Sequence, residues 1–522
     1  MNGKRNRFIL KGMLLLSMAL PASVLRSQEI YDWEAWRDGR NIAGLAASSS
    51  PRVAIAGLIK RSSVELTGGV ESGGYRSQSE APTLWKGGVN ADTEVHFYDI
   101  LLTGSFSFAM SGGDGMCGSM FTRPGYYPID ILEFTPGAKT LQEYGMGGGI
   151  AWKNDSRVTP GATFRFDGAN YSKRKDLRHT TYRQELEIVP SLIWDGDGVV
   201  LGVSGIFGKD SEFVQAEQIG TATAESYYAF LDKGLMYGTY KVWDGNGVHL
   251  SENGVDRLPV KQFSYGLALQ AELGGFLYGD FEYLRTTGEV GEKGYSWFRF
   301  PGSTMDAKLR WTLHRPSGVH VFKASFEWMR QETDESVIDK ITEGGVTTPR
   351  EYGSNRIFER RSLSGGPEYS FYGTGGAELH TRVHVIKEKD RSTLMYPYLD
   401  LDEVTLLRIN AEGKLPLGSF ELEGGLSAGC KIGEHSHIIG NDNPELGVVS
   451  APFRMEEWFA REQELDDATF VGLSAGLRYN FTLPGGYNMY AAARYSLLHA
   501  FGIKLLPGSE RHTAHITLGY EF

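Results

Sequence analysis

The chain has 522 residues, of which 64 are acidic and 53 are basic, so its formal net charge at pH 7 is −11. This acidic balance disfavours nucleic acid as a partner, because the phosphate backbone is bound by clustered Lys and Arg side chains. The two cysteines argue against a disulfide-stapled secreted scaffold, and the 67 glycines are about twice the usual share.

Residues 1–27 have the composition of a secretory signal peptide. Four basic residues occur among the first eleven, a short apolar run extends from Met13 to Leu20, and Pro21 and Ala22 follow. This run is too short for a spanning helix, which needs roughly 20 apolar residues. We therefore expect export, with cleavage between residues 22 and 27, and no spanning helix elsewhere in the chain.

Residues 28–61 precede the first predicted strand. Trp33, Trp36, Ile42 and Leu45 are loosely spaced as on one helix face, with Gly39 interrupting the run. Two interpretations stay open: a lead that packs on the periplasmic rim of the following domain, or a small plug inside it.

From residue 62 to the C-terminus, segments that alternate apolar and polar residues are separated by turn residues such as Asp-Gly, Gly-Gly and Pro-Gly. Such alternation predicts β-strands with one apolar face. The predicted strands are 63–73, 86–97, 101–110, 145–153, 158–171, 182–194, 199–208, 262–273, 276–285, 303–314, 319–330, 363–372, 377–387, 404–415, 419–432, 469–481, 487–498 and 511–522.

The connections between these strands alternate between short and long. Most short ones have roughly two to five residues, whereas 111–144, 209–261, 331–361 and 433–468 each exceed about 30. This layout is typical of bacterial outer-membrane barrels, which have short periplasmic turns and long extracellular loops. We predict an all-β fold for residues 62–522: a transmembrane antiparallel up-and-down β-barrel of 14 to 18 strands, with 18 as the best count.

The last strand carries Ala514, Ile516, Leu518, Tyr520 and Phe522 on one face. It resembles the C-terminal signal strand of bacterial outer-membrane barrels, which ends in an aromatic residue. The resemblance implies an outer-membrane location surrounded by outer-membrane lipid. It also implies that Leu518, Tyr520 and Phe522 form the assembly signal for the barrel-insertion machinery.

Three further segments, Trp36–Leu45, 103–108 (TGSFSF) and 175–178 (KDLR), resemble a family of Bacteroidota outer-membrane barrels without an assigned function. That family has proline at the position of Leu177. Residues 40–46 (RNIAGLA) are also similar to the N-P-A-G-L-A motif near the start of long-chain fatty-acid transporter barrels, with Ile42 in place of the proline. These resemblances imply fold and location but no mechanism.

Two predicted strands carry titratable residues opposite their apolar face. Lys or Arg in the lipid at mid-membrane costs about 2 to 4 kcal/mol, so we expect these side chains to line the lumen. They act either as a salt-bridge ladder that braces the wall or as a polar constriction that selects solutes. The candidates are Asp306, Lys308, Arg310, Glu378, His380, Arg382 and His384.

We predict no metal site, cofactor or enzymatic activity. On a strand, His380 and His384 lie roughly 13 Å apart, too far to share one ion. His435 and His437 form only a weak candidate for a surface metal. Neither a G-x-S-x-G elbow nor an H-E-x-x-H motif occurs. We expect Cys117 and Cys430 to be unpaired, because their hairpins lie far apart around the predicted wall.

The sequence therefore favours a passive channel or transport component for small solutes. The alternative is a barrel scaffold for surface recognition, or a partner in an outer-membrane uptake complex with a surface lipoprotein or receptor. An aromatic cluster in one predicted outer loop motivates this alternative, because such clusters are frequent contact sites. Its members are Tyr227, Tyr228, Tyr237, Tyr240 and Trp243.

Overall fold

The computed structural model describes residues 33–48, 62–97, 99–153, 156–175, 177–217, 228–242, 257–292, 295–392, 400–433, 436–438 and 455–521. The described helices are α2 (Trp33–Asp38), α3 (Ile42–Ser48) and α4 (Met455–Asp467). None of them is long and apolar enough to span a membrane. The described strands are β1 (Ser62–Gly73), β2 (Thr83–Phe97), β3 (Ile100–Ser119), β4 (Asp130–Trp152), β5 (Val158–Lys173), β6 (Arg178–Asp195), β7 (Val199–Glu217), β8 (Tyr228–Asp232), β9 (Gly238–Val242), β10 (Arg257–Leu273), β11 (Leu277–Glu292), β12 (Tyr295–Arg315), β13 (Gly318–Glu343), β14 (Val346–Gly373), β15 (Glu378–Ser392), β16 (Asp400–Leu417), β17 (Phe420–Lys431), β18 (Ser436–Ile438), β19 (Thr469–Leu483), β20 (Tyr487–Phe501) and β21 (Glu510–Glu521).

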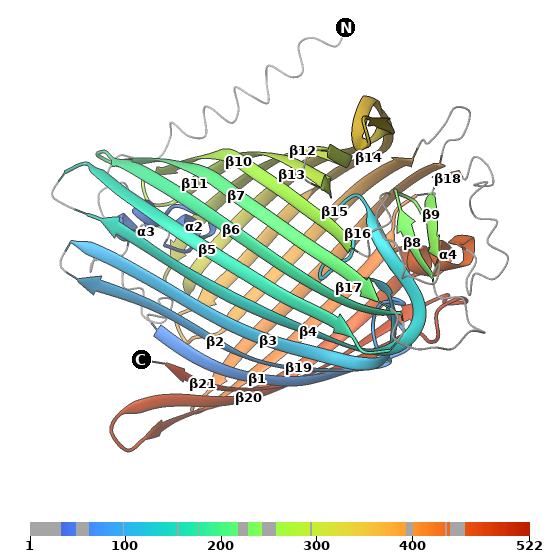
Figure 1. Cartoon of the computed structure of the whole chain (residues 1–522). Helices are drawn as coiled ribbons and strands as arrows, with labels where there is room; N and C mark the ends of the chain where they lie inside the picture. Colours follow the sequence, from blue (N-terminus) through green and yellow to red (C-terminus); the bar gives the residue numbers. More distant parts are fainter. Residues whose placement is uncertain are drawn as a thin grey trace, which may run out of the picture.

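The strands form one closed antiparallel barrel of 18 strands, so the predicted fold class and best strand count are confirmed (Figure 1). Each strand pairs with the next one along the wall, with β7 joined to β10 and β17 to β19. The short strands β8, β9 and β18 are additional to the wall. β21 pairs with β1 over eleven residue pairs, from Ser63–Glu521 to Gly73–Arg511, and this pairing closes the sheet.

The alternation of each strand separates a lipid-facing surface from the lumen. On β10, Leu267 and Leu269 are 47% and 49% exposed, whereas Ala268 between them is 1% exposed. Large exposed apolar side chains recur at every second position on the neighbouring strands, as on the outer face of a transmembrane barrel. The apolar surface faces outward because the polar residues can be solvated only inside.

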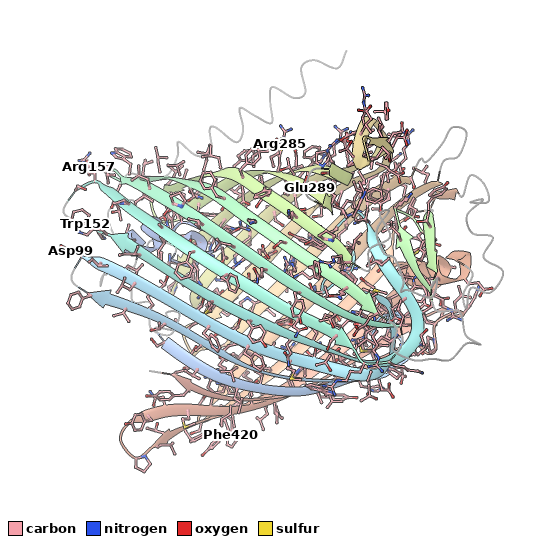
Figure 2. The ribbon with its side chains drawn as sticks, viewed as in Figure 1. Asp99, Trp152, Arg157, Arg285, Glu289 and Phe420 are labelled. Carbon is pink, nitrogen blue, oxygen red and sulfur yellow. The ribbon has the colours of Figure 1, made fainter. Side chains whose placement is uncertain are left out.

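One end of the barrel carries tight turns, such as 196–198 between β6 and β7 and 316–317 between β12 and β13. Asp99, Trp152 and Arg157 lie at this end (Figure 2). The connections predicted to be long all lie at the opposite end. The short-turn end therefore corresponds to the predicted periplasmic side.

At the long-loop end the structure differs from the sequence-based boundaries, because much of the predicted loop sequence is strand. Residues 331–361 form the outer parts of β13 and β14, joined by a two-residue turn at Gly344 and Gly345. Both glycines have positive φ, 61° and 83°, as a two-residue hairpin turn requires. Beyond the membrane both strand faces meet water, so the apolar alternation stops while backbone pairing and ion pairs such as Arg356–Asp334 continue.

The outer end of the β1–β21 junction is held by charged contacts. The Arg511 guanidinium contacts Glu71 and Glu80, each at 2.5 Å. Helix α4 bridges both neighbouring connections: Glu462 accepts the Gln78 N–H at 2.9 Å, and Glu464 accepts the N–H groups of three successive residues, 504–506. The junction is therefore fixed by backbone pairing inside the membrane and by side chains outside it.

We predict that deleting Phe522 severely lowers the amount of protein in the outer membrane but leaves refolded protein nearly as heat-resistant as the parent. One aromatic side chain contributes about 1.5 to 3 kcal/mol of burial, little beside the β1–β21 pairing. Membrane levels of parent and variant are compared by fractionation, and heat resistance by gel mobility after refolding in detergent. Phe522 lies outside the described residues; normal membrane levels after its deletion would contradict its assignment as an assembly signal.

Candidate functional site

The two N-terminal helices lie inside the barrel at the short-turn end, against the inner wall (Figure 1). We call residues 33–48 the N-terminal segment. Trp36 is fully buried; its indole N–H donates to Glu272 at 2.5 Å, and its ring packs edge-on against Tyr278 at 5.2 Å. These partners stand on the lumen face of β10 and β11, so the segment occupies part of the lumen.

Polar contacts fix the turn between the two helices. The Asn41 amide donates to Gln270 at 3.1 Å, and Gln270 donates in turn to the Gly39 carbonyl at 2.9 Å. Arg40 forms an ion pair with Glu187 at 3.0 Å. Hydrogen bonds and ion pairs between the segment and the wall compensate the burial of these polar wall residues.

Glycines on the wall provide the space that the segment needs. A Cβ atom at Gly149 would lie 2.3 Å from the Ile42 side chain, and one at Gly161 would lie 2.6 Å from it. Real Cβ contacts are not this short, so both positions require glycine for Ile42 to lie against β4 and β5. These two glycines thus serve close packing inside the lumen.

A cavity of about 300 Å³ lies between the N-terminal segment and strands β2 to β6. Arg37, Arg40, Ile42 and Leu45 line it from the segment. From the wall it is lined by acidic, basic, hydroxyl and glycine residues, among them Asp92, Glu94, Thr103, Ser105, Gly147, Thr163, Arg165 and Glu187.

The predicted lumen residues of β12 stand opposite its lipid-facing side chains. Leu309 and Trp311 are 52% and 46% exposed, whereas Arg310 between them is 8% exposed. Asp306 and Lys308 share the parity of Arg310, and β12 pairs Lys308 with Asp280 and Asp306 with Glu282. This side of the lumen is packed with side chains and with the N-terminal segment.

The predicted residues of β15 lie in a more open environment. Arg382 forms an ion pair with Glu368 at 3.0 Å and is 48% exposed, and the His380 ring contacts Ser370 at 3.0 Å and is 42% exposed. Glu378 lies 3.7 Å from Lys414. His384, opposite Arg408, completes the row. The structure therefore separates the two predicted groups, which lie on different strands with different solvent access.

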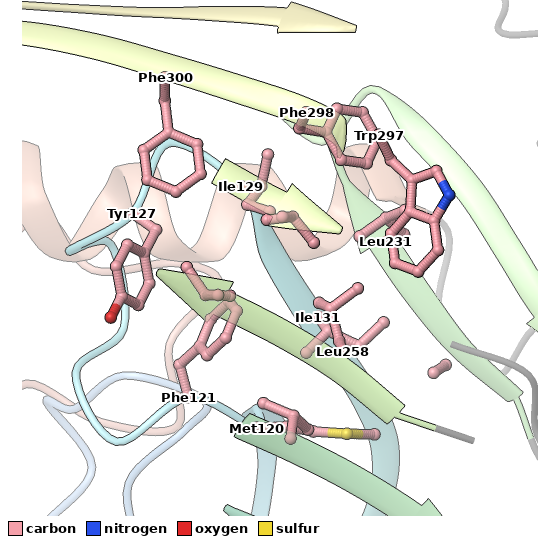
Figure 3. Close-up of a cluster of buried hydrophobic side chains, with 14 of the residues drawn as sticks. Met120, Phe121, Tyr127, Ile129, Ile131, Leu231, Leu258, Trp297, Phe298 and Phe300 are labelled. Carbon is pink, nitrogen blue, oxygen red and sulfur yellow. The ribbon is translucent and has the colours of Figure 1, made fainter. Parts of the chain in front are cut away.

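At the outer end, residues 120–129 and the β8–β9 hairpin fold over the inside of the extended wall. We call these two segments the outer cap. Their apolar side chains converge with inward-facing residues of β7, β10, β11, β12 and β14 in an apolar core (Figure 3). The buried members are Met120, Phe121, Tyr127, Ile129, Ile131, Leu177, Val214, Ala216, Ala229, Leu231, Leu258, Val260, Val290, Trp297, Phe298, Phe300, Ile357 and Phe358.

A buried ion cluster lies beside the outer cap. Glu133 binds Lys139 at 2.9 Å and Lys173 at 2.5 Å, and none of the three side chains is exposed. His179 lies nearby, where burial first and the two lysines second hold the pKa of its ring well below the usual value. Removing one partner from such a cluster typically costs 3 to 5 kcal/mol, because a buried charge is left uncompensated.

The sequence did not reveal this cluster, the cavity or the cap. Glu133 and Lys139 lie within the predicted loop 111–144, so the sequence assigned them no strand face, and nothing in the spacing joined them to Lys173. From the aromatic cluster, Tyr237 is buried at the cap, whereas Tyr227 and Trp243 lie outside the described residues. Cys117 and Cys430 are both free, which confirms the prediction that they are unpaired.

No group of three or more His, Cys, Asp or Glu residues within the described ranges is arranged to hold a metal ion. His435 lies outside these ranges, and the side chain of His437 is not described. The 195–198 stretch, which begins like a calcium loop, is a turn in which the Gly196 N–H donates to Val199 at 2.8 Å.

The closed wall, the lipid-facing apolar surface and the polar lumen together define an outer-membrane β-barrel. The chain belongs to the family described as "Family of unknown function (DUF6850)", whose model matches residues 55–522. A comparison with curated protein sequences found no match.

Among solved structures, the chain is similar to BauA, the ferric preacinetobactin receptor from Acinetobacter baumannii, with 7% identity, a TM-score of 0.41, and 88% of this chain and 80% of that chain covered. It is also similar to the copper transporter OprC, with 10% identity, a TM-score of 0.40, and 88% and 82% covered. OccK10 (OpdN) from Pseudomonas aeruginosa matches with 9% identity, a TM-score of 0.29, and 88% and 98% covered.

We predict that Trp36→Ala loosens the N-terminal segment while the barrel stays intact. Truncating a buried Trp typically costs 3 to 5 kcal/mol. Amide exchange at Gly39 and Leu45, whose N–H groups bond within the segment, should therefore rise on the order of 100-fold or more. Hydrogen exchange followed by mass spectrometry measures the effect. The control is Trp311→Ala on the lipid face, which should leave exchange in residues 33–48 unchanged; an equal rise in both variants would contradict the assigned packing.

The outer cap should loosen as the pH rises. Asp130 and Asp232 face each other across β4 and β8, and burial raises the pKa of each to about 7, helped at Asp130 by the neighbouring Asp232 carboxylate. A raised carboxyl pKa adds stability that is complete below the ordinary value near 4 and is lost as the pH rises towards 7. Exchange in residues 228–242, corrected for intrinsic rates, should be faster at pH 8 than at pH 5.5.

The double variant Asp130→Asn and Asp232→Asn should remove this pH dependence. Asn keeps an oxygen that can accept the N–H bonds now made to Asp130 by Ile131 and to Asp232 by Gly234. The exposed Asp114→Asn variant serves as the control and should retain the pH dependence. Equal exchange of the parent at both pH values would show that these carboxyls do not govern the cap.

Proposed function

We propose that the protein is a passive channel or transport component that carries small polar solutes along the β15–β20 side of its lumen. One observation carries this proposal: charged lumen-facing side chains on the β15–β20 side are solvated, whereas polar ones on β10 and β11, beside the N-terminal segment, are buried. The side chains of Glu412, Arg382 and Arg494 are 58%, 48% and 40% exposed. By contrast, Glu272, Gln270 and Asp280 are 2%, 3% and 8% exposed.

The exposed residues carry both signs of charge, which suits polar solutes. Arg494, for example, bonds Glu412 at 2.9 Å along the inner surface of the wall. Charged side chains lining a pore select solutes by charge and size. An 18-strand barrel is also wide enough to leave an aqueous channel when its lumen is only partly filled.

The finer predictions from the sequence belong to this proposal. The N-terminal segment serves as a small plug, the lumen residues of β12 and β15 form the polar wall, and the protein has no enzymatic activity. The assembly signal for the insertion machinery consists of Leu518, Tyr520 and Phe522. The Bacteroidota origin and the likeness to fatty-acid transporters at 40–46 stay predictions.

A scaffold for surface recognition is the second candidate, and the β13–β14 extension favours it. This extension is braced by exposed ion pairs such as Arg299–Glu351 at 2.6 Å. A rigid hairpin beyond the membrane offers a surface for a lipoprotein or receptor in an uptake complex.

Planar-bilayer recording separates these candidates. We expect a steady conductance from the purified parent, and Arg382→Glu should shift the reversal potential in a salt gradient towards cation preference, because it replaces a positive lumen charge with a negative one. Lys387→Glu on the same strand faces outward and serves as the matched control, with an unchanged reversal potential. Silence of the parent, with capture of a surface partner, would favour the scaffold.

A further inference from the structure

The wall beneath the N-terminal segment contains a recess. Paired positions across five neighbouring strands place Asp92, Ser105, Gly147, Arg165 and Glu187 in one row, in that order from β2 to β6. The middle positions, on β3 and β4, carry only a serine and a glycine. These small side chains project little into the lumen, which leaves a depression between an acidic residue on β2 and a basic residue on β5.

The next row towards the short-turn end repeats this arrangement. It runs through Glu94, Thr103, Gly149 and Thr163 and ends at Val189. Its acidic residue again stands on β2, and hydroxyl groups flank the glycine. The Ile42 side chain lies over Gly149, so the recess is open at the Gly147 row, and Glu94 and Thr103 add hydrogen-bonding groups at its edge.

The N-terminal segment covers the recess and turns it into the 300 Å³ cavity. Arg37 and Arg40 bring two guanidinium groups to the cavity, while Ile42 and Leu45 provide an apolar boundary. A small volume with few convergent polar groups and some apolar lining is typical of a site for a small ligand.

The charges on the two sides of the recess do not neutralise each other. Arg165 is held by Asp167 at 2.9 Å and Glu185 at 3.4 Å, on its own side. The Asp92 carboxylate has no hydrogen bond or ion pair among the described residues. A guanidinium has five N–H donors, so Arg165 retains donors for a further acceptor.

A second position in the same barrel shows how such a gap can be closed. Glu412 on β16 and Arg494 on β20 are also three strands apart, and the wall between them carries Gly425 and Ser474. There the Arg494 side chain crosses the gap and bonds Glu412 at 2.9 Å. On β2 and β5 the short Asp92 side chain and the tethered Arg165 leave the corresponding space open.

We propose that this recess binds a short zwitterionic peptide of two or three residues. Its ammonium group lies at Asp92 and Glu94, and its carboxylate lies at Arg165 and Arg40. Three strand spacings amount to roughly 14 Å, and an extended chain of two or three residues spans about 7 to 10 Å, so the acidic and basic side chains fill the remainder. The inference rests on the proposed solute transport and names its substrate class.

Titration calorimetry of the full-length protein in detergent tests the proposal with triglycine as the probe. We expect triglycine to bind. The N-acetylated, C-amidated peptide, which has neither charge, and N-acetyl-triglycine, which has only the carboxylate, should each bind at least tenfold more weakly. Equal binding of the blocked peptide would overturn the proposal, and equal binding of N-acetyl-triglycine would show an anion site instead.

Asp92→Asn and Arg165→Gln should each weaken triglycine binding at least tenfold. Asp114→Asn and Arg285→Gln change the same residue types outside the cavity and should leave binding unchanged. Heat-modifiable gel mobility shows that each variant is a folded barrel. Conductance is recorded on the same preparations. If the parent conducts but does not bind triglycine, the peptide site alone is overturned. If the parent does not conduct, the transport proposal is overturned.

Discussion

Every feature of this protein depends on the hydrogen bonds between β21 and β1. In lipid an unpaired backbone N–H or C=O costs several kcal/mol, so a sheet is stable there only if its edges meet. The eleven pairs between Ser63–Glu521 and Gly73–Arg511 remove both edges. Closure with 18 strands then sets a wide lumen, and the chain must either leave that lumen to water or fill it.

The protein leaves one side of the lumen to water and fills the two ends of the other with chain segments. The contacts that hold these segments differ between the two ends. At the short-turn end the N-terminal segment satisfies polar wall residues such as Glu272 and Gln270. At the outer end the cap buries apolar side chains such as Phe298 and Phe300 against Met120 and Ile131. Strands β15 to β20 are left with solvated charges, because neither filling extends to them.

The membrane explains how far the sequence could be interpreted. Lipid on one side and water on the other impose alternation on segments such as 262–273, so the strands and their number were predictable. Outside the lipid this constraint ends, so the sequence predicts a loop over 331–361, where the structure continues β13 and β14. The cap has no periodicity at all, since Met120 and Phe121 are buried from an irregular connection. The cavity depends on Asp92 and Arg165 occupying one row, three strand spacings apart, a relation that only the register shows.

The outer cap and the N-terminal segment are held by different contacts, and this difference decides which end of the lumen opens more readily. Removing the cap would expose apolar side chains of the cap and of the wall beneath it. Each Å² of apolar surface returned to water costs about 25 cal/mol of free energy. Removing the N-terminal segment would expose polar wall groups together with apolar wall side chains such as Ile193, Val200 and Leu101. Water can replace the bonds that Asn41 and Arg40 make to Gln270 and Glu187. The two apolar clusters at the segment, around Trp36 and around Ile42 and Leu45, are smaller than the cluster at the cap. The Trp36 N–H also bonds a carboxylate that water could solvate. We therefore expect the cap to stay closed while the segment moves, so a solute held beneath the segment would leave towards the short-turn end.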